Sequence, residues 1–137
     1  MVYRILSIDG GGVRGLVATI WLNRLETLLR APLREHFDLI AGTSTGSIIA
    51  CAVSMGMSAE AIVNFYLTQS REVFPRGTNQ IWNRIGRSLS QGLDAPRYDG
   101  KGLERVLKRV FGTMSFGDLS TRTLVTSYDT LNREPWC

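Results

Sequence analysis

The chain has 137 residues, of which 44% are hydrophobic and 20% are charged, and its net charge is +4. This length predicts one domain with a core of its own, and the composition excludes an intrinsically disordered chain. No apolar run approaches the length of a membrane span, and the first strand candidate starts too early to leave room for a signal peptide. The two cysteines, Cys51 and Cys137, do not make a disulfide framework, so we expect a reducing, cytoplasmic location.

Positive charge is concentrated in the middle of the chain. Between Arg71 and Arg109 the sequence has nine basic and four acidic residues, and the remainder is close to neutral. A basic surface suits anionic partners such as phospholipid headgroups or nucleic acid. A solvated helical face gives the same pattern, so charge alone does not decide between the two interpretations.

The first half of the chain predicts a strand-helix-strand-helix order. Residues 4–8 are a strand candidate, and residues 16–29 repeat apolar side chains at helical spacing until Pro32. A second strand is expected at residues 37–41, followed by an apolar helix that Gly56 closes. Two strands joined by such a helix should be parallel, with a right-handed crossover.

The second half predicts two more helices and a third strand. Residues 58–71 form a helix capped by its first serine, and residues 102–111 form another that ends at a glycine. Residues 123–128 are the third strand, and residues 129–137 are expected to be a turn-like tail. We therefore expect an α/β fold with three layers, α/β/α, around a mostly parallel sheet.

Residues 77–100 are the least regular part of the sequence. An apolar stripe at helical spacing lies within them, made of Ile81, Trp82, Ile85 and Leu89, with Arg84 and Arg87 nearby. Such a stripe is typical of a core-facing helix, and it also fits a lid helix that lies on a membrane surface.

The pentapeptide Gly42-Thr43-Ser44-Thr45-Gly46 has the pattern Gly-x-Ser-x-Gly between a predicted strand and a predicted helix. In that setting the pattern predicts a nucleophile elbow, in which a sharp turn exposes the serine at a helix N-terminus. Glycine is needed at both ends because larger side chains would collide with neighbouring backbone. The same letters also occur in ordinary glycine-serine turns, so the elbow is a hypothesis that geometry has to test.

A glycine loop follows the first strand, and three interpretations of it compete. Its residues are Gly10, Gly11, Gly12, Val13, Arg14 and Gly15. A dinucleotide site needs an acidic residue at the end of the second strand, where the sequence has Ala41-Gly42, and a nucleotide P-loop needs lysine where it has Leu16. The third interpretation is an oxyanion hole made by the N–H groups of Gly11, Gly12 and Val13, because this loop and the elbow follow parallel strands and share one rim of the sheet.

A serine nucleophile needs a base, and the single histidine, His36, is badly placed for that role. It precedes the strand that ends at the elbow, which puts it roughly 16 Å from Ser44. A Ser-His-Asp triad is therefore excluded within this chain, which leaves a carboxylate or a lysine. Asp129 follows the third strand and lies at the correct rim, although an aspartate there is more typical of a turn cap.

These features together resemble the patatin-like phospholipase family. The stretch Asp9-Gly-Gly-Gly-Val-Arg-Gly15 looks like its oxyanion loop, and Gly42-Thr-Ser-Thr-Gly46 looks like its elbow. The resemblance covers residues 1–137 as one domain and implies a lipid acyl hydrolase that uses a Ser-Asp dyad. It also implies a lipid substrate met at a membrane surface, and neither a cofactor, a metal nor a nucleic acid.

The chain departs from the family's pattern at the dyad. The family's catalytic aspartate lies in an Asp-Gly-Gly or Asp-Gly-Ala triplet well beyond the third strand, and Asp9-Gly10-Gly11 occupies the oxyanion position instead. The chain thus looks like the front part of such a domain, truncated at its C-terminus, with Ser44 as nucleophile and no base. The alternative is a catalytically dead lipid- or protein-binding module of the same fold. A sheet without its later strands also predicts an uncovered edge and a marginal or self-associating chain.

Overall fold

The computed structural model describes residues 2–73, 101–129 and 131–136. The chain forms two compact units, one of residues 1–67 with 114–137 and one of residues 68–113. The first unit contains the sheet and the glycine-rich turns. The irregular segment 77–100, with its stripe at residues 81–89, lies outside the described residues.

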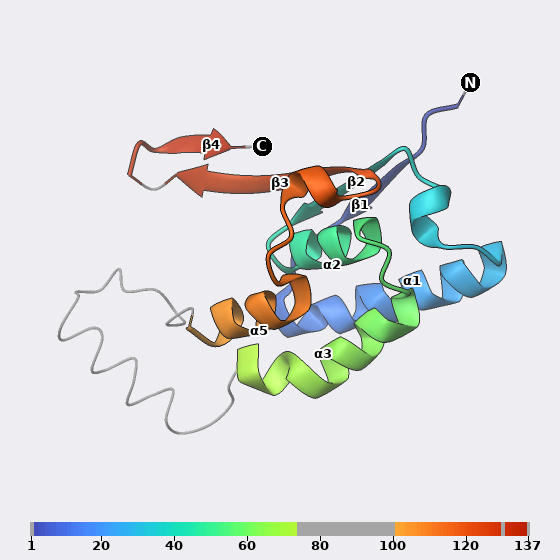
Figure 1. Cartoon of the computed structure of the whole chain (residues 1–137), viewed down its shortest axis with the longest axis horizontal. Coiled ribbons are helices and arrows are strands. Elements are labelled where there is room, and N and C mark those ends of the chain that lie inside the picture. The colour runs from blue at the N-terminus through green and yellow to red at the C-terminus, as the bar shows by residue number, and fades with distance from the viewer. Residues whose placement is uncertain (1, 74–100, 130, 137) are drawn as a thin grey trace. The chain divides into compact units, whose positions relative to one another are not determined.

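A four-stranded sheet is the centre of the first unit (Figure 1). Its strands are β1 (Ile5–Ile8), β2 (Leu39–Thr43), β3 (Arg122–Asp129) and β4 (Glu134–Trp136), in that spatial order. The first three strands are parallel, and β4 runs antiparallel to β3. The predicted α/β class with a mostly parallel sheet is confirmed.

The helices of the first unit cover one face of this sheet. α1 (Gly15–Leu29) joins β1 to β2, and α2 (Thr45–Ser54) follows β2, and both lie on the same side of the sheet in Figure 1. Ile8 and Ile40 point to that side and are buried with Ile49 of α2. Neighbours along the strands point the other way, and Ile5 is 55% exposed on that face.

Local sequence explains where the helices begin and end. α3 (Ala59–Val73) begins after Ser58, whose Oγ accepts the Ala61 N–H at 3.2 Å, as the predicted cap requires. α1 ends because Arg30 adopts a left-handed conformation with φ 54, and its N–H donates to the Glu26 carbonyl at 3.0 Å. Pro32 then prevents the helix from resuming.

The predicted position of β2 and the predicted turn-like tail were both wrong. β2 begins two residues later than expected, at Leu39, because the Asp38 carboxylate first accepts the Arg4 N–H at 2.7 Å. The tail also contains a strand, β4, which the turn-like composition of residues 129–137 did not predict. Its Pro135 pairs with Tyr128 at the edge of the sheet, where a missing N–H is tolerated.

The second unit contains the end of α3 and α5 (Lys101–Phe111). The predicted helix at residues 102–111 is thereby confirmed, and Gly112 follows it at φ 57 with its N–H on the Lys108 carbonyl. Within this unit the Arg109 guanidinium donates to the Gln69 side chain at 2.6 Å. Of the helices in the described parts of the chain, none is both long and apolar enough to cross a membrane.

Candidate active site

The turn between β2 and α2 holds Ser44 in a strained conformation. Ser44 has φ 54 and ψ −124, which a residue with a side chain seldom adopts, and it lies between Thr43 of β2 and Thr45 of α2. Backbone strain of this kind costs on the order of 1–3 kcal/mol and persists only where the surrounding structure enforces it. Ser44 is exposed, so its hydroxyl is open to solvent.

Glycine is required on both sides of this turn because the backbone passes too closely for a side chain. A Cβ on Gly42 would lie 2.3 Å from the Gly46 carbonyl oxygen, and a Cβ on Gly46 would lie 2.1 Å from the Ile8 carbonyl oxygen. Real Cβ contacts are essentially never shorter than 3.0 Å. The backbone therefore passes both glycines as closely as the Gly-x-Ser-x-Gly spacing predicted.

The glycine loop, residues 10–15, lies directly against this turn. A Cβ on Gly10 would come within 2.8 Å of the Ser44 Cβ and 3.5 Å of its Oγ. The two segments are 34 residues apart in sequence and meet because the parallel strands β1 and β2 end side by side, with Ile8 paired to Gly42. The loop and the serine are thus adjacent, as the shared rim of the sheet predicted.

The amides of the glycine loop are not equivalent. The Gly11 N–H donates to the Thr45 Oγ1 at 3.1 Å, and the Arg14 N–H donates to the Gly11 carbonyl at 3.1 Å. Among the described residues, no hydrogen bond engages the N–H of Gly12 or Val13. Of the three amides expected to converge, Gly11 therefore has a different partner, which leaves two as candidate donors.

Tyr66 of α3 contacts the first residues of both α1 and α2. Its hydroxyl donates to the Thr45 carbonyl at 3.4 Å, and its ring lies so close to Gly15 that a Cβ there would be 2.7 Å from the phenol oxygen. The sequence predicted the helix at residues 58–71 but gave Tyr66 no role in the site. Its helical phase gave no signal that it would touch α1 and α2 at once, because both contacts are tertiary.

Burial raises the pKa of Tyr66 to about 12, above its ordinary value of 10. The unfolded phenol ionises near pH 10 while the folded one keeps its proton, so the stabilisation is complete below pH 10 and is lost as the pH rises to 12. The loss should reach about 2.7 kcal/mol at most, because each of the two pKa units corresponds to about 1.4 kcal/mol. We expect the urea midpoint to fall more between pH 9 and 11.5 in the wild type than in Tyr66→Phe. Equal falls would contradict this assignment.

The electrostatics of the site favour negative charge. α1 begins at Gly15 and α2 begins at Thr45, and the N-terminal end of a helix carries a partial positive charge. Neither helix has an acidic residue in its first turn that would neutralise this charge. Arg14, which is exposed, adds a full positive charge beside the loop. Two helix N-termini therefore begin beside Ser44, while the exposed side chains of Asp9 and Arg14 carry opposite charges on either side of the three glycines.

The two base candidates lie away from the serine. His36 precedes β2, so the five residues of that strand, roughly 16 Å long, separate it from Ser44. Thr126 pairs with Thr43, and Asp129 lies three residues further along β3, roughly 10 Å beyond that level.

Asp129 is also occupied by its own turn. Its carboxylate accepts the N–H groups of Leu131 and Asn132 and the side-chain amide of Asn132, at 2.8 to 3.1 Å. These bonds, with those from Asn132 strongest, lower the pKa of Asp129. The aspartate is thus a turn cap, the more typical of its two predicted roles.

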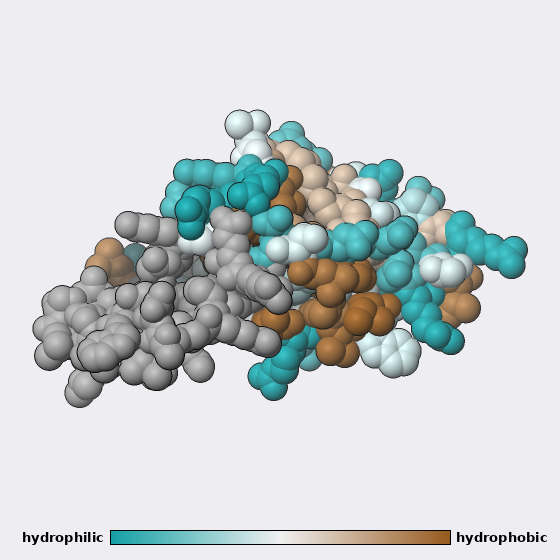
Figure 2. Space-filling model, turned by 90° about the horizontal axis from the view of Figure 1, so that it is seen from below, coloured by the Kyte–Doolittle hydropathy of each residue, from teal (hydrophilic) through white to brown (hydrophobic). Residues whose placement is uncertain are grey.

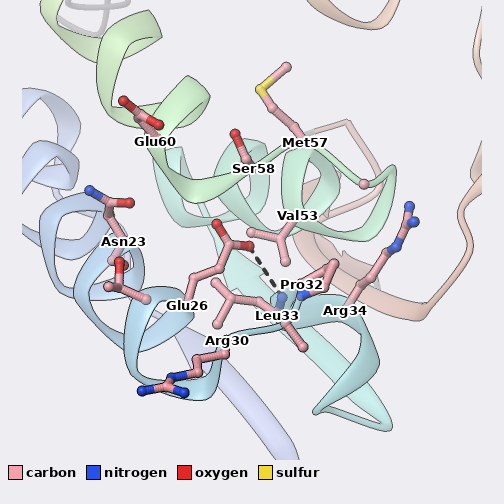
Figure 3. A pocket seen from close by; sticks show the side chains of 13 residues that line it. Asn23, Glu26, Arg30, Pro32, Leu33, Arg34, Val53, Met57, Ser58 and Glu60 are labelled. Carbon is pink, nitrogen blue, oxygen red and sulfur yellow. Dashed lines mark hydrogen bonds between the residues drawn. The ribbon is translucent and has the colours of Figure 1, made fainter.

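A hollow of about 380 Å³ lies elsewhere, at the C-terminal end of α1 (Figure 3). The described residues that line it include neither Ser44 nor the glycine loop. The Glu26 carboxylate in its wall accepts the Leu33 N–H at 3.3 Å and the Ala59 N–H at 2.8 Å. Because Glu26 joins α1 to the start of α3, this hollow belongs to the framework of the fold and not to the serine site.

Comparison with known proteins shows the family to which the chain is similar. Residues 6–135 match the family model described as patatin-like phospholipase. Patatin-like protein 2 of Arabidopsis thaliana is 32% identical over 96% of this chain and 35% of its own length. A cGAMP-activated phospholipase of Pseudomonas aeruginosa is 36% identical over 90% of this chain and 35% of its own length.

A solved structure shows the same fold. The type III effector protein ExoU superposes with a TM-score of 0.52 at 16% identity, over 97% of this chain and 34% of that one. The chain spans about a third of the length of the curated relatives it matches. Because the family model covers nearly all of its residues, the chain belongs to the patatin-like phospholipase family.

Proposed function

We propose that this chain carries the nucleophile and the oxyanion loop of a lipid acyl hydrolase, with Ser44 as the nucleophile. The observation that supports it most is the contact between the strained serine and the glycine loop, where Gly10 lies against the Ser44 side chain. The family match supports a lipid ester as the substrate. A reactive hydroxyl beside unengaged backbone N–H groups is the arrangement that acyl transfer requires.

The chemistry divides between the two turns. The Ser44 Oγ attacks the ester carbonyl carbon while its proton passes to a general base, and the carbonyl oxygen becomes an oxyanion. The N–H groups of Gly12 and Val13, which have no partner among the described residues, donate to that oxyanion, assisted by the N-termini of α1 and α2. The tetrahedral intermediate expels the alcohol, which takes the proton back, and water then cleaves the acyl-serine ester.

The other glycine-loop and elbow residues have supporting roles in this proposal. Gly42 and Gly46 allow the sharp turn, and Thr45 holds the Gly11 amide through its hydroxyl. Arg14 contributes positive charge. The base stays unassigned, because Asp129 is engaged in its turn and the family's Asp-Gly-Gly triplet has no counterpart after β3 in this sequence.

The engagement of Asp129 favours a second function, a non-catalytic lipid- or protein-binding module. Without a base, the Ser44 hydroxyl remains a weak nucleophile. The fold and the glycine loop would then serve recognition alone. This alternative differs from the first in a measurable way, because it predicts a folded chain whose serine does not react.

A fluorophosphonate probe separates the two functions. We expect the probe to form an adduct on Ser44 of the wild-type chain, located by peptide mass spectrometry, and none on Ser44→Ala. Ser127→Ala, which removes an exposed serine of β3, should be labelled like the wild type. A folded wild-type chain with a sharp melting transition and no adduct would show that this chain, for which no base is assigned, does not react by itself, which favours the binding module.

A further inference from the structure

The outer face of α1 carries large apolar side chains in water. Four of them are more than half exposed, namely Val17 at 59%, Ile20 at 53%, Trp21 at 68% and Leu28 at 71%. Ile20 and Trp21 lie three and four residues after Val17, and Leu28 lies two turns after Trp21. The four side chains therefore form one stripe along the helix. Figure 2 shows that hydrophobic atoms gather on the underside of the molecule among hydrophilic ones. We call these four residues the α1 stripe.

The exposed charged residues of α1 and its two ends are arginines, whereas the nearby exposed carboxylate of Glu60 in α3 lies by the hollow at the C-terminal end of α1. Arg24 is exposed and lies between Trp21 and Leu28 on the same face, and exposed arginines stand at both ends of the helix, Arg14 and Arg30. The only acidic residue of α1 is Glu26. It is half-buried, and its carboxylate accepts two backbone N–H groups.

This combination of charge and hydrophobicity selects one kind of partner. A helix that presents aliphatic side chains, a tryptophan and arginines together can lie in the plane of a bilayer interface. Its arginines are attracted to anionic headgroups, whereas a second copy of the same face would bring arginines close to one another. We propose that the α1 stripe, with Arg14, Arg24 and Arg30, docks on an anionic phospholipid surface.

The position of α1 connects this surface to the serine site. α1 begins at Gly15, the last residue of the glycine loop that lies against Ser44. A chain bound through α1 would hold that loop close to the lipid. This connection to catalysis rests on the proposed hydrolase function, whereas the docking itself is measured without any chemistry.

Sedimentation with sucrose-loaded vesicles tests the proposal on the whole chain. Vesicles of phosphatidylcholine with 30% phosphatidylglycerol should bind the wild type, and pure phosphatidylcholine should bind it at least tenfold more weakly. The double variant Trp21→Ser with Leu28→Ser should lose at least tenfold in partitioning, and Arg24→Gln several-fold. Leu131→Ser is the matched control, because Leu131 is 88% exposed in the β3–β4 turn, and it should bind within twofold of the wild type.

Three results would overturn the docking surface. The first is an absence of binding to the anionic vesicles, and the second is an equal loss in the stripe variant and in Leu131→Ser. The third is a wild-type dimer in sedimentation velocity that the stripe variant abolishes, which identifies a second copy as the occupant. Ser44→Ala should bind vesicles like the wild type, so a failure of the hydrolase function and a failure of docking are distinguished.

Discussion

Replacing Gly46 by alanine is expected to lower the free energy of unfolding by about 3 kcal/mol or more, as severe overpacking does. Gly46 is in the first turn of α2, where alanine is the better helix former by about 1 kcal/mol. The clash outweighs this gain in helix propensity and makes the variant less stable. The new Cβ would lie 2.1 Å from the Ile8 carbonyl oxygen and 2.9 Å from that of Asp9. Both are backbone atoms, so neither can rotate away.

Gly117→Ala provides the matched control. A Cβ at Gly117 would have its nearest neighbour at 3.6 Å, the end of the Ser115 side chain. We expect this variant to unfold within about 0.5 kcal/mol of the wild type, as exposed substitutions usually do. Urea denaturation measures both. If Gly46→Ala had the same urea midpoint as the wild type, the start of α2 could not lie as close to the end of β1 as the structure shows.

Replacing Val13 by proline is expected to slow fluorophosphonate labelling of Ser44 by about 100-fold or more. Proline has no backbone N–H, so the variant removes one of the two candidate donors of the oxyanion hole. One such donor contributes about 2.7–4 kcal/mol to the transition state of acyl transfer. Val13 lies in the 3₁₀ turn Gly12–Arg14, and the usual φ of a 3₁₀ helix is close to that of proline, although Gly12 itself has φ 57.

Val13→Ala separates donor loss from side-chain loss. This variant keeps the N–H and removes only two methyl groups, so its labelling rate should fall far less than that of Val13→Pro. Melting temperatures of both variants show whether the loop still folds. Similar rates in the two variants, at similar stability, would remove Val13 from the oxyanion hole.

The sequence was a good guide wherever a feature depends on local backbone chemistry. The spacing of Gly42 and Gly46 around Ser44 predicted the sharp turn because each glycine meets neighbouring backbone. The order of strands and helices predicted that β1 and β2 would be parallel, and the parallel pairing then brought the glycine loop to the serine. Apolar periodicity predicted where the helices lie but not the phase of α1, because its buried residues are Gly15, Thr19 and Leu22 while Trp21 and Leu28 are exposed.

Features that depend on tertiary contacts could not be predicted in the same way. Tyr66 reaches Thr45 across 21 residues of sequence, and nothing in the α3 pattern distinguishes this tyrosine from an ordinary core residue. The bond between Gly11 and Thr45 is of the same kind, since it depends on which side-chain oxygen lies nearest the loop. β4 was missed because its three residues owe their conformation to pairing with β3.

That the uncovered sheet edge makes the chain marginally stable or self-associating remains a prediction. β1 is at one end of the strand order, and Val2, Tyr3 and Ile5 beside it are each more than half exposed. An edge strand with exposed apolar neighbours favours association between chains. The α1 stripe adds a second apolar surface in the same unit.

A crystal structure of the chain after fluorophosphonate labelling would test the central claim most directly. We expect a phosphorus atom bonded to the Ser44 Oγ and a phosphoryl oxygen within about 3 Å of the Gly12 and Val13 nitrogens. An adduct whose phosphoryl oxygen points to solvent, away from both amides, would show that the glycine loop is not the oxyanion hole.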